Sequence, residues 1–218
     1  FRTPLTLVLG PLDDLLRDTR GRLTEAVRAH LQLAQRNARR VLDLIVELLD
    51  VNRLEQGQLP LRIGVHDLAA LLRRIADENA PLVERYGQSL QLDCPAAGAP
   101  ARIDPAQIER CIVNLLSNAA KYSPRGSEMV LALRRDTRHW RIDVRDQGRG
   151  IAPEALPHVF DRFFQTEDSD QASGYGIGLS LVREIALAHG GDVQATSELG
   201  VGSCFSLRLP ADDATTAA

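Results

Sequence analysis

Hydrophobic residues in the first part of the chain recur at intervals of three and four positions. Before the polar stretch 18–22 they stand at Leu5, Leu9, Leu12 and Leu16, and after it at Val27, Leu31, Ala34, Ala38, Val41, Ile45 and Leu48. This spacing is typical of two helices that pack along a coiled-coil seam. Thr24 with Glu25 marks a helix start, and Gly57 with Pro60 marks a helix end. The sequence therefore predicts a helical hairpin over residues 1–57.

The apolar stripe of this hairpin is too narrow to enclose a core by itself. The economical solution is pairing with a second copy into a four-helix bundle, so we predict a homodimer. A monomeric hairpin packed on the rest of the chain is the alternative. Gly10-Pro11 interrupts the first helix, because proline lacks the amide hydrogen and clashes with the preceding turn. We expect a bend there.

From Leu61 onward the pattern changes to shorter, mixed elements. Short apolar or alternating runs predict strands at 59–65, 89–93, 101–103, 128–134, 140–144, 192–196 and 203–209. Helices are predicted over 67–85, over 105–122 and after Gly178. This combination predicts an α+β sandwich, in which a mixed, mostly antiparallel sheet is covered by helices on one face. We expect this domain to span 61–210, with a flexible tail at 211–218.

Composition narrows the class of protein. The chain has 218 residues, 44% of them hydrophobic and 25% charged, which fits a soluble protein of one large or two small domains. A net charge of −3 gives no basic field, so we expect no nucleic-acid partner. No apolar run approaches the roughly 20 residues of a membrane-spanning helix, so we expect no membrane contact in this fragment. The chain opens at Phe1 without a start methionine, and we expect a piece of a longer protein.

Cysteine usage points to a reducing compartment. The three cysteines, Cys94, Cys111 and Cys204, are widely spaced and form no C-x-x-C pair. This pattern excludes a disulfide framework and a zinc knuckle, so we expect a cytoplasmic location.

The predicted helix at 105–122 carries polar residues that need a reason. Asn114 and Asn118 are four positions apart and share a face, with Lys121 beside them one turn on. Both asparagines could be buried amides satisfied by nearby backbone. Alternatively, an amide oxygen ligates a hard cation such as Mg²⁺ while Lys121 neutralises phosphate oxygens. Lys121 is the only lysine in the chain, and a compact ammonium suits a cramped phosphate pocket.

Two further segments combine glycines with polar residues. Asp146 ends a predicted strand and is followed by Gly148 and Gly150, which would let the backbone approach a flat ligand while the carboxylate accepts a bond from an exocyclic amine. An ordinary turn is the alternative. Residues 174–179, Gly-Tyr-Gly-Ile-Gly-Leu, run straight into a helix whose first amides could bind phosphate, or they form a flexible hinge. The polar stretch 165–173 before them is predicted to be a mobile lid. Residues 200–205 are predicted to be a turn.

In chain order these segments resemble the asparagine box and the three glycine boxes of sensor histidine kinases. The ATP-binding domain of that family is shared with gyrase, a heat-shock chaperone and a mismatch-repair ATPase. Residues 159–164 resemble the family's phenylalanine box, although alone they fit a core-packing aromatic cluster equally well. Residues 1–6, Phe-Arg-Thr-Pro-Leu-Thr, are similar to the tail of the histidine box. The resemblance covers essentially the whole chain.

The resemblance implies a role for each matching position. Asn118 matches the Mg²⁺-binding asparagine, Asp146 the aspartate that reads adenine, Lys121 a phosphate contact and Tyr122 a residue that packs against the nucleotide. Asn114 stands where ATP-hydrolysing relatives carry a glutamate that activates water, and an amide cannot act as that base. The set expected to bind ATP is Asn114, Asn118, Lys121, Tyr122, Asp146, Gly148, Gly150, Ile151, Arg162, Gly174, Gly176, Ile177, Gly178, Leu179 and Ser203.

The catalytic residues implied are Thr3, Asn114 and Lys121, and the cofactors are ATP and Mg²⁺. Thr3 matches a threonine that helps to position water for dephosphorylating the partner regulator, although a threonine that satisfies a helix end is an equal alternative. Where many family members place an arginine or lysine toward the terminal phosphate this chain has Gln165, and Arg162 is the candidate substitute.

The resemblance implies the catalytic core of a two-component sensor histidine kinase, with a response regulator receiver domain as partner. The phospho-accepting histidine would lie just before Phe1, so we expect this chain alone to bind Mg·ATP without phosphorylating itself. One rival is a nucleotide-gated conformational clamp of the same superfamily, which a glutamate at position 114 would favour. The other is a phosphatase-dominant signalling scaffold, for which Asn118→Ala would leave signalling unchanged.

Overall fold

The computed structural model describes residues 9, 11–13, 15–16, 24–55, 61–95, 98–136, 138–165 and 176–211. The chain divides into two units, Phe1–Arg53 and Leu54–Ala218. Each unit is described by itself.

The first unit contains the long helix α2, Glu25–Glu55. It begins where the sequence predicts, because Thr24 Oγ1 accepts a hydrogen bond from the Val27 amide at 3.4 Å. The described residues before position 17 are also helical, and Arg28 of α2 donates to the carbonyl of Leu16 at 3.3 Å. These contacts support the predicted hairpin. Gly10, Gly57 and Pro60 lie outside the described residues. The bend expected at Gly10-Pro11 and the helix end expected at Gly57 and Pro60 therefore stay predictions.

The second unit contains helices and strands close to the predicted positions. They are β1 (Gly64–Asp67), α3 (Leu68–Arg85), β2 (Ser89–Asp93), β3 (Pro100–Ile103), α4 (Pro105–Tyr122), β4 (Glu128–Arg135), β5 (His139–Arg145), the 3₁₀ helix η1 (Leu156–His158), α5 (Gly178–Ala188), β6 (Asp192–Glu198) and β7 (Gly202–Pro210). The expected α+β architecture is confirmed.

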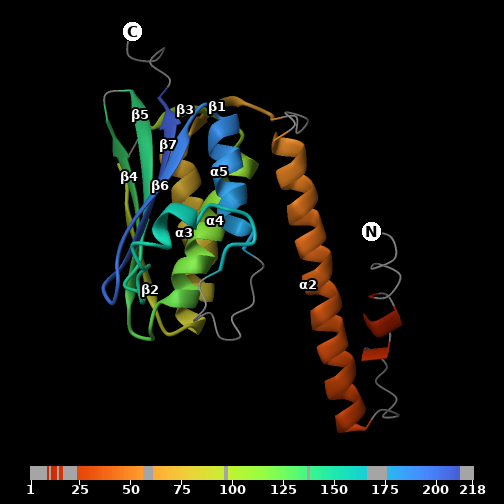
Figure 1. Cartoon of the computed structure of the whole chain (residues 1–218). Coiled ribbons are helices and arrows are strands. Elements are labelled where there is room, and N and C mark those ends of the chain that lie inside the picture. Colours follow the sequence, from red (N-terminus) through yellow and green to blue (C-terminus); the bar gives the residue numbers. More distant parts are fainter. Residues whose placement is uncertain are drawn as a thin grey trace. The chain divides into compact units, whose positions relative to one another are not determined.

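The five-stranded sheet has the order β2-β4-β5-β7-β6. β2 runs parallel to β4, and the other neighbours are antiparallel, so the sheet is mixed. Helices α3, α4 and α5 cover one face of it (Figure 1). In β5 and β7, side chains that point toward the helices alternate with mostly polar ones, and in β7 Phe205, Leu207 and Leu209 are buried. They pack against buried leucines and isoleucines of the helices and form the core, in which each such side chain contributes about 1.5–3 kcal/mol on burial.

The strand predicted at 59–65 overlaps the observed one only at its end. The observed strand β1 begins at Gly64 and pairs only with β3, in a separate antiparallel ribbon. Ile63 and Val65 are 42% and 57% exposed, so the alternating apolar residues that suggested a strand do not face a core. Asp67, the last residue of β1, caps the next helix: its Oδ1 accepts a hydrogen bond from the Ala69 amide at 2.9 Å at the start of α3.

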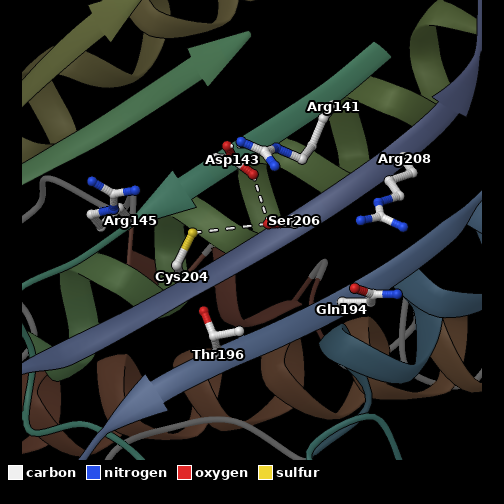
Figure 2. Close-up of a pocket in the computed structure, with 8 residues that line it drawn as sticks. All are labelled: Arg141, Asp143, Arg145, Gln194, Thr196, Cys204, Ser206 and Arg208. Carbon is white, nitrogen blue, oxygen red and sulfur yellow. Dashed lines mark hydrogen bonds and ion pairs between the residues drawn. The ribbon is translucent and has the colours of Figure 1, made fainter. Parts of the chain in front are cut away.

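The face of the sheet turned away from the helices is polar. Arg141, Asp143 and Arg145 project from β5, and Cys204, Ser206 and Arg208 project from the neighbouring β7 (Figure 2). Together with Gln194 and Thr196 of β6 they line a hollow of about 440 Å³.

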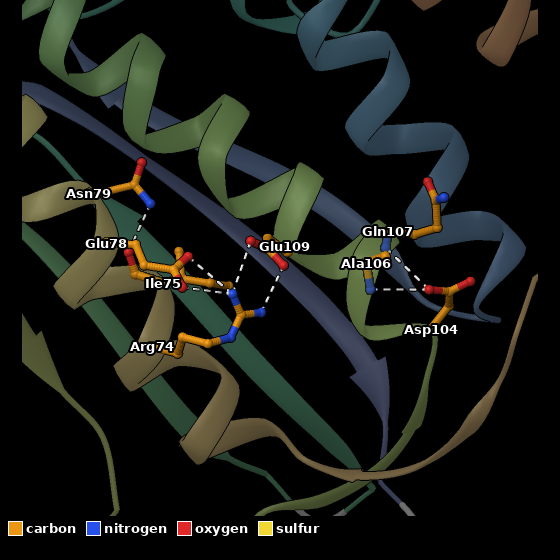
Figure 3. Close-up of polar contacts among 8 residues, drawn as sticks. All are labelled: Arg74, Ile75, Glu78, Asn79, Asp104, Ala106, Gln107 and Glu109. Carbon is orange, nitrogen blue, oxygen red and sulfur yellow. Dashed lines mark hydrogen bonds and ion pairs between the residues drawn. The ribbon is translucent and has the colours of Figure 1, made fainter.

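Polar contacts at its start fix helix α4, which carries the predicted asparagines. Asp104 Oδ1 accepts hydrogen bonds from the amides of Ala106 and Gln107 at 3.1 and 3.3 Å, which satisfies the first turn (Figure 3). One turn further on, Glu109 pairs with Arg74 of α3 at 2.7 Å, and Arg74 also pairs with Glu78 at 3.0 Å. These exposed pairs contribute little stability each, but they set the position of α4 against α3.

Candidate functional site

The second half of α4 carries the predicted amide row at the edge of the core. Leu115, Leu116, Ala119 and Ala120 are buried on one side of the helix, while Asn114, Asn118, Lys121 and Tyr122 are half-buried. A Cβ atom on Gly178 would lie 3.6 Å from Asn114 Oδ1, so this amide faces the first residue of α5. The structure therefore brings Asn114 next to the start of α5, which belongs to the predicted glycine segment 174–179.

Two cations lie close to the ring of Tyr122. Lys121 Nζ is 4.7 Å from the ring centroid, and the guanidinium carbon of Arg149 is 5.0 Å from it. The Arg149 amide also donates to the Tyr122 carbonyl at 3.3 Å. These cation–π contacts hold two positive groups at the end of α4. Sequence reasoning did not identify Arg149, and its only signal was its place between the two glycines of the Asp146 segment.

Asp146 follows β5 and is 7% exposed. Its Oδ1 accepts hydrogen bonds from the amides of Gly148 and Ser203 at 2.8 and 3.1 Å. Burial raises the pKa of the carboxyl, and the two amide donors partly oppose that shift. Its Oδ2 accepts no hydrogen bond from the part of the chain that the structure describes. One oxygen is thus held by the protein, and the other can receive a donor from a ligand.

The glycines that follow Asp146 meet protein backbone. Gly150 has φ +72°, and a Cβ on it would overlap the carbonyl of Glu198. Gly202 has φ +146°, and a Cβ there would overlap the carbonyl of Asp146. Only glycine fits both positions, because the two loops touch backbone to backbone. At Gly150 the missing side chain makes room for the turn between β6 and β7, and the expected contact of this glycine with a flat ligand stays a prediction.

A pair of serines joins the same two loops from the inner side. Ser197 Oγ accepts from the Ile151 amide at 2.8 Å, donates to the Gly202 carbonyl at 2.8 Å and lies 2.9 Å from Ser203 Oγ. The side chain of Ser203 is thus bonded to Ser197, and its amide to Asp146. Ser197 was missed by sequence reasoning, because an alternating serine in a strand carries no distinctive signal.

The ends of the predicted lid meet in a short stem. The Phe163 amide donates to the Gly176 carbonyl at 2.8 Å, and both residues have positive φ, +62° and +69°. A Cβ on Gly176 would lie 2.6 Å from the Phe164 carbonyl, so glycine is required there. Phe160 packs edge to face against Phe205, with ring centroids 6.3 Å apart, which anchors this side of the stem to the sheet.

The remaining predicted residues divide into two groups. Ile177 is buried, while Leu179 and Arg162 are half-buried near the stem and the start of α5. Thr3, Gly174 and most of the lid at 165–173 lie outside the described residues. Among the described residues no group of three His, Cys, Asp or Glu side chains could hold a metal ion, so a bound cation would rely on an amide such as Asn118 together with ligand phosphates. No described helix is long and apolar enough to cross a membrane.

Two family models match the chain. The His Kinase A (phospho-acceptor) domain matches residues 1–57, and the histidine kinase-, DNA gyrase B-, and HSP90-like ATPase matches residues 103–213. Curated relatives include the adaptive-response sensory kinase SasA of Synechococcus sp. (strain JA-3-3Ab), 33% identical, and histidine kinase P4 of Formosa agariphila, 31% identical. Both alignments cover 96% of this chain, which spans only 56% and 16% of those relatives.

Solved structures agree with these matches. Full-length ShkA in complex with AMPPNP superposes with a TM-score of 0.85 at 28% identity, over 99% of this chain and 45% of that one. The Acinetobacter baumannii histidine kinase AdeS gives a TM-score of 0.70 at 22% identity, over 96% of both chains, and this likeness supports the fold alone.

Proposed function

The chain belongs to the histidine kinases and holds both parts of their catalytic core, and from this premise we propose that it transfers the γ-phosphoryl group of ATP to a histidine and then to an aspartate of a response regulator. The observation that carries the nucleotide half of the proposal is the arrangement of Asp146. A buried carboxylate has one oxygen fixed by two backbone amides and the other left for a ligand donor. This is the arrangement that the exocyclic amine of adenine requires.

The groups around Asp146 suit the rest of the nucleotide. In the proposal, Tyr122 packs against the nucleotide, Lys121 neutralises phosphate oxygens, and Asn118 supplies an oxygen ligand to Mg²⁺. The half-buried position of all three on one end of α4 supports these roles. Magnesium, when bound, would screen the charge that develops on the phosphates during transfer.

Asn114 favours phosphoryl transfer over hydrolysis. Its amide faces the start of α5, at the position where ATP-hydrolysing relatives carry a glutamate. An amide has no basic form at neutral pH, so it cannot activate water. In the proposed reaction the bond from the γ-phosphorus to the β,γ-bridging oxygen breaks, ADP leaves with that electron pair, and a histidine nitrogen forms the new bond to phosphorus.

The acceptor half of the proposal concerns the first unit. The phospho-acceptor domain model matches residues 1–57, and residues 1–6 resemble the end of the histidine box, so the proposed acceptor is the histidine of that box. Thr3 would position water when the regulator is dephosphorylated. Exposed apolar side chains on α2, among them Val27, Leu33, Val41 and Leu49, support dimerisation through the hairpin.

The test uses the full-length parent protein and γ-labelled ATP with magnesium. The expected product is a phosphoprotein that is labile in acid and stable in base, and Asn118→Ala should abolish it. Ser117→Ala, an exposed neighbour on α4, is the matched control and should keep full activity. Labelling that survives Asn118→Ala, or ATP turnover to free phosphate without a phosphoprotein, would contradict the proposal and favour the scaffold or the clamp.

A further inference from the structure

Arginines crowd the face of the sheet that is turned away from the nucleotide pocket and the helices. The strand register sets Arg134 opposite Arg141, and Arg141 opposite Arg208, so three arginines stand side by side across β4, β5 and β7. Like charges directly opposite in a sheet destabilise it, so arginines in such a row need anionic partners.

Carboxylates on this face neutralise part of the row. Arg134 is bonded to Asp93, and Arg141 Nε donates to Asp143 Oδ2 at 3.0 Å. Asp143 is 6% exposed, and its Oδ1 accepts from Ser206 Oγ at 2.6 Å, so both of its oxygens are in use. Asp192 of β6 stands opposite Arg208 in the strand register, but within the described residues no ion pair joins Arg145 or Arg208 to a carboxylate, and the buried Nε of Arg208 donates no hydrogen bond.

The positive groups lie at two ends of the hollow. Arg208 stands beside Arg141 at one end, while Arg145 is opposite Cys204, four residues back along β7, which corresponds to about 13 Å. The occupied carboxylate of Asp143 lies between these ends (Figure 2). A volume of about 440 Å³ is in the range of small-molecule sites. The matching ligand has an anionic group at each end and a neutral middle.

We propose that the outer-face hollow binds a small molecule with two phosphoryl groups, held by Arg141 and Arg208 at one end and by Arg145 at the other. The guanidinium fork matches phosphate oxygens in pairs, which suits both ends. Ser206, Gln194 and Thr196 line the middle and offer neutral polar groups. The alternative is a solvated basic face that attracts any anion weakly.

The binding test uses this chain in EDTA, so that magnesium-dependent binding at the nucleotide pocket is suppressed. Fructose 1,6-bisphosphate, whose phosphoryl groups are separated by a neutral sugar, is the probe. Pyrophosphate, whose phosphoryl groups are adjacent, controls for their spacing, and inorganic phosphate and sulfate control for charge alone. Calorimetry should give a dissociation constant at least about tenfold lower for the probe than for each of the three controls. Equal, weak binding of all four anions, tighter binding of pyrophosphate than of the probe, or no binding of the probe would overturn the proposal.

A chemical readout places the ligand. Cys204 lines the hollow and is half-buried, whereas Cys94 is half-buried outside the hollow. The bound probe should slow alkylation of Cys204 by iodoacetamide and leave Cys94 unaffected, as followed by mass spectrometry. Protection of both cysteines or of neither would contradict a ligand at this position.

Variants distinguish binding at this site from general attraction of anions to positive charge. Arg208→Gln and Arg145→Gln should each weaken probe binding about tenfold or more, while Arg102→Gln, an exposed arginine on β3, should not. Affinity for Mg·AMPPNP should be unchanged. Equal probe binding by Arg208→Gln and the parent chain would refute the site.

Discussion

Replacing Asp146 by asparagine should separate nucleotide recognition from folding. The asparagine Oδ1 can still accept from the amides of Gly148 and Ser203, at 2.8 and 3.1 Å in the parent chain. The second oxygen, however, becomes an NH₂ group, which donates where the adenine amine also donates. Loss of a hydrogen bond to a charged acceptor costs about 1.5–3 kcal/mol, which corresponds to roughly 10–150-fold in affinity.

The same substitution should not harm the fold. Burial raises the pKa of Asp146, which means that the folded protein holds the charged form at a cost. Asp146→Asn removes that charge and keeps the two amide bonds, so the melting temperature should stay the same or rise. Calorimetric titration with Mg·AMPPNP and thermal unfolding followed by circular dichroism measure the two effects on one sample.

Asp143→Asn is the matched control. Asp143 is equally buried, at 6% against 7% exposed, but it points from β5 to the opposite face of the sheet and bonds to Arg141 and Ser206. Its substitution should lower stability and leave Mg·AMPPNP affinity unchanged. The reasoning is refuted if Asp146→Asn binds like the parent chain, or if both variants lose affinity in proportion to their loss of stability.

Three further outcomes follow from the site. Between the ordinary and the raised pKa of Asp146, the folded state binds more protons than the unfolded state, so the contribution of this carboxyl to stability falls as pH rises. Nucleotide affinity should rise over the same pH window, because the carboxylate form accepts the hydrogen bond. Stability and affinity measured across this pH range should show neither trend in Asp146→Asn. Gly202→Ala should destabilise the fold by about 2–5 kcal/mol in urea unfolding, since the new Cβ overlaps backbone atoms and φ is unfavourable for alanine. Gly200 has φ +82° but open space around it, so Gly200→Ala should cost only about 1–2 kcal/mol. Equal losses in the two variants would contradict the close packing at Gly202. Asn118→Ala should make AMPPNP affinity independent of magnesium while Ser117→Ala keeps the dependence, and an EDTA titration of both variants tests this.

Local patterns predicted the elements of the second unit well. Helix α4 runs from Pro105 to Tyr122 as expected, because its Asp104 cap, its first-turn proline and its apolar spacing all lie within one short window. The strand predicted at 59–65 was misplaced because its local pattern was not informative enough. Its alternating residues are exposed, and alternation alone does not tell which side of a strand meets a core.

The sequence did not show how the predicted segments contact one another. Asn114 lies beside Gly178, and Tyr122 beside Gly148, but the contacts of Gly150 and Gly202 are with residues about fifty positions away in the chain. No local window contains such a pair, so their role as a backbone junction was not readable. Ser197 and Arg149 were missed for the same reason, since only the folded chain brings them to the loops that they hold.

The hydrogen bond between Phe163 and Gly176 has a consequence for protein engineering. Because the Phe163 amide is bonded to the Gly176 carbonyl, the two ends of the segment between them stay together whatever the number of residues in that segment. Doubling the length of such a loop costs only about 0.6 kcal/mol of closure entropy. Exchanging this segment between relatives should therefore cost the fold little, and it would measure how much the segment, with Gly174, contributes to nucleotide affinity.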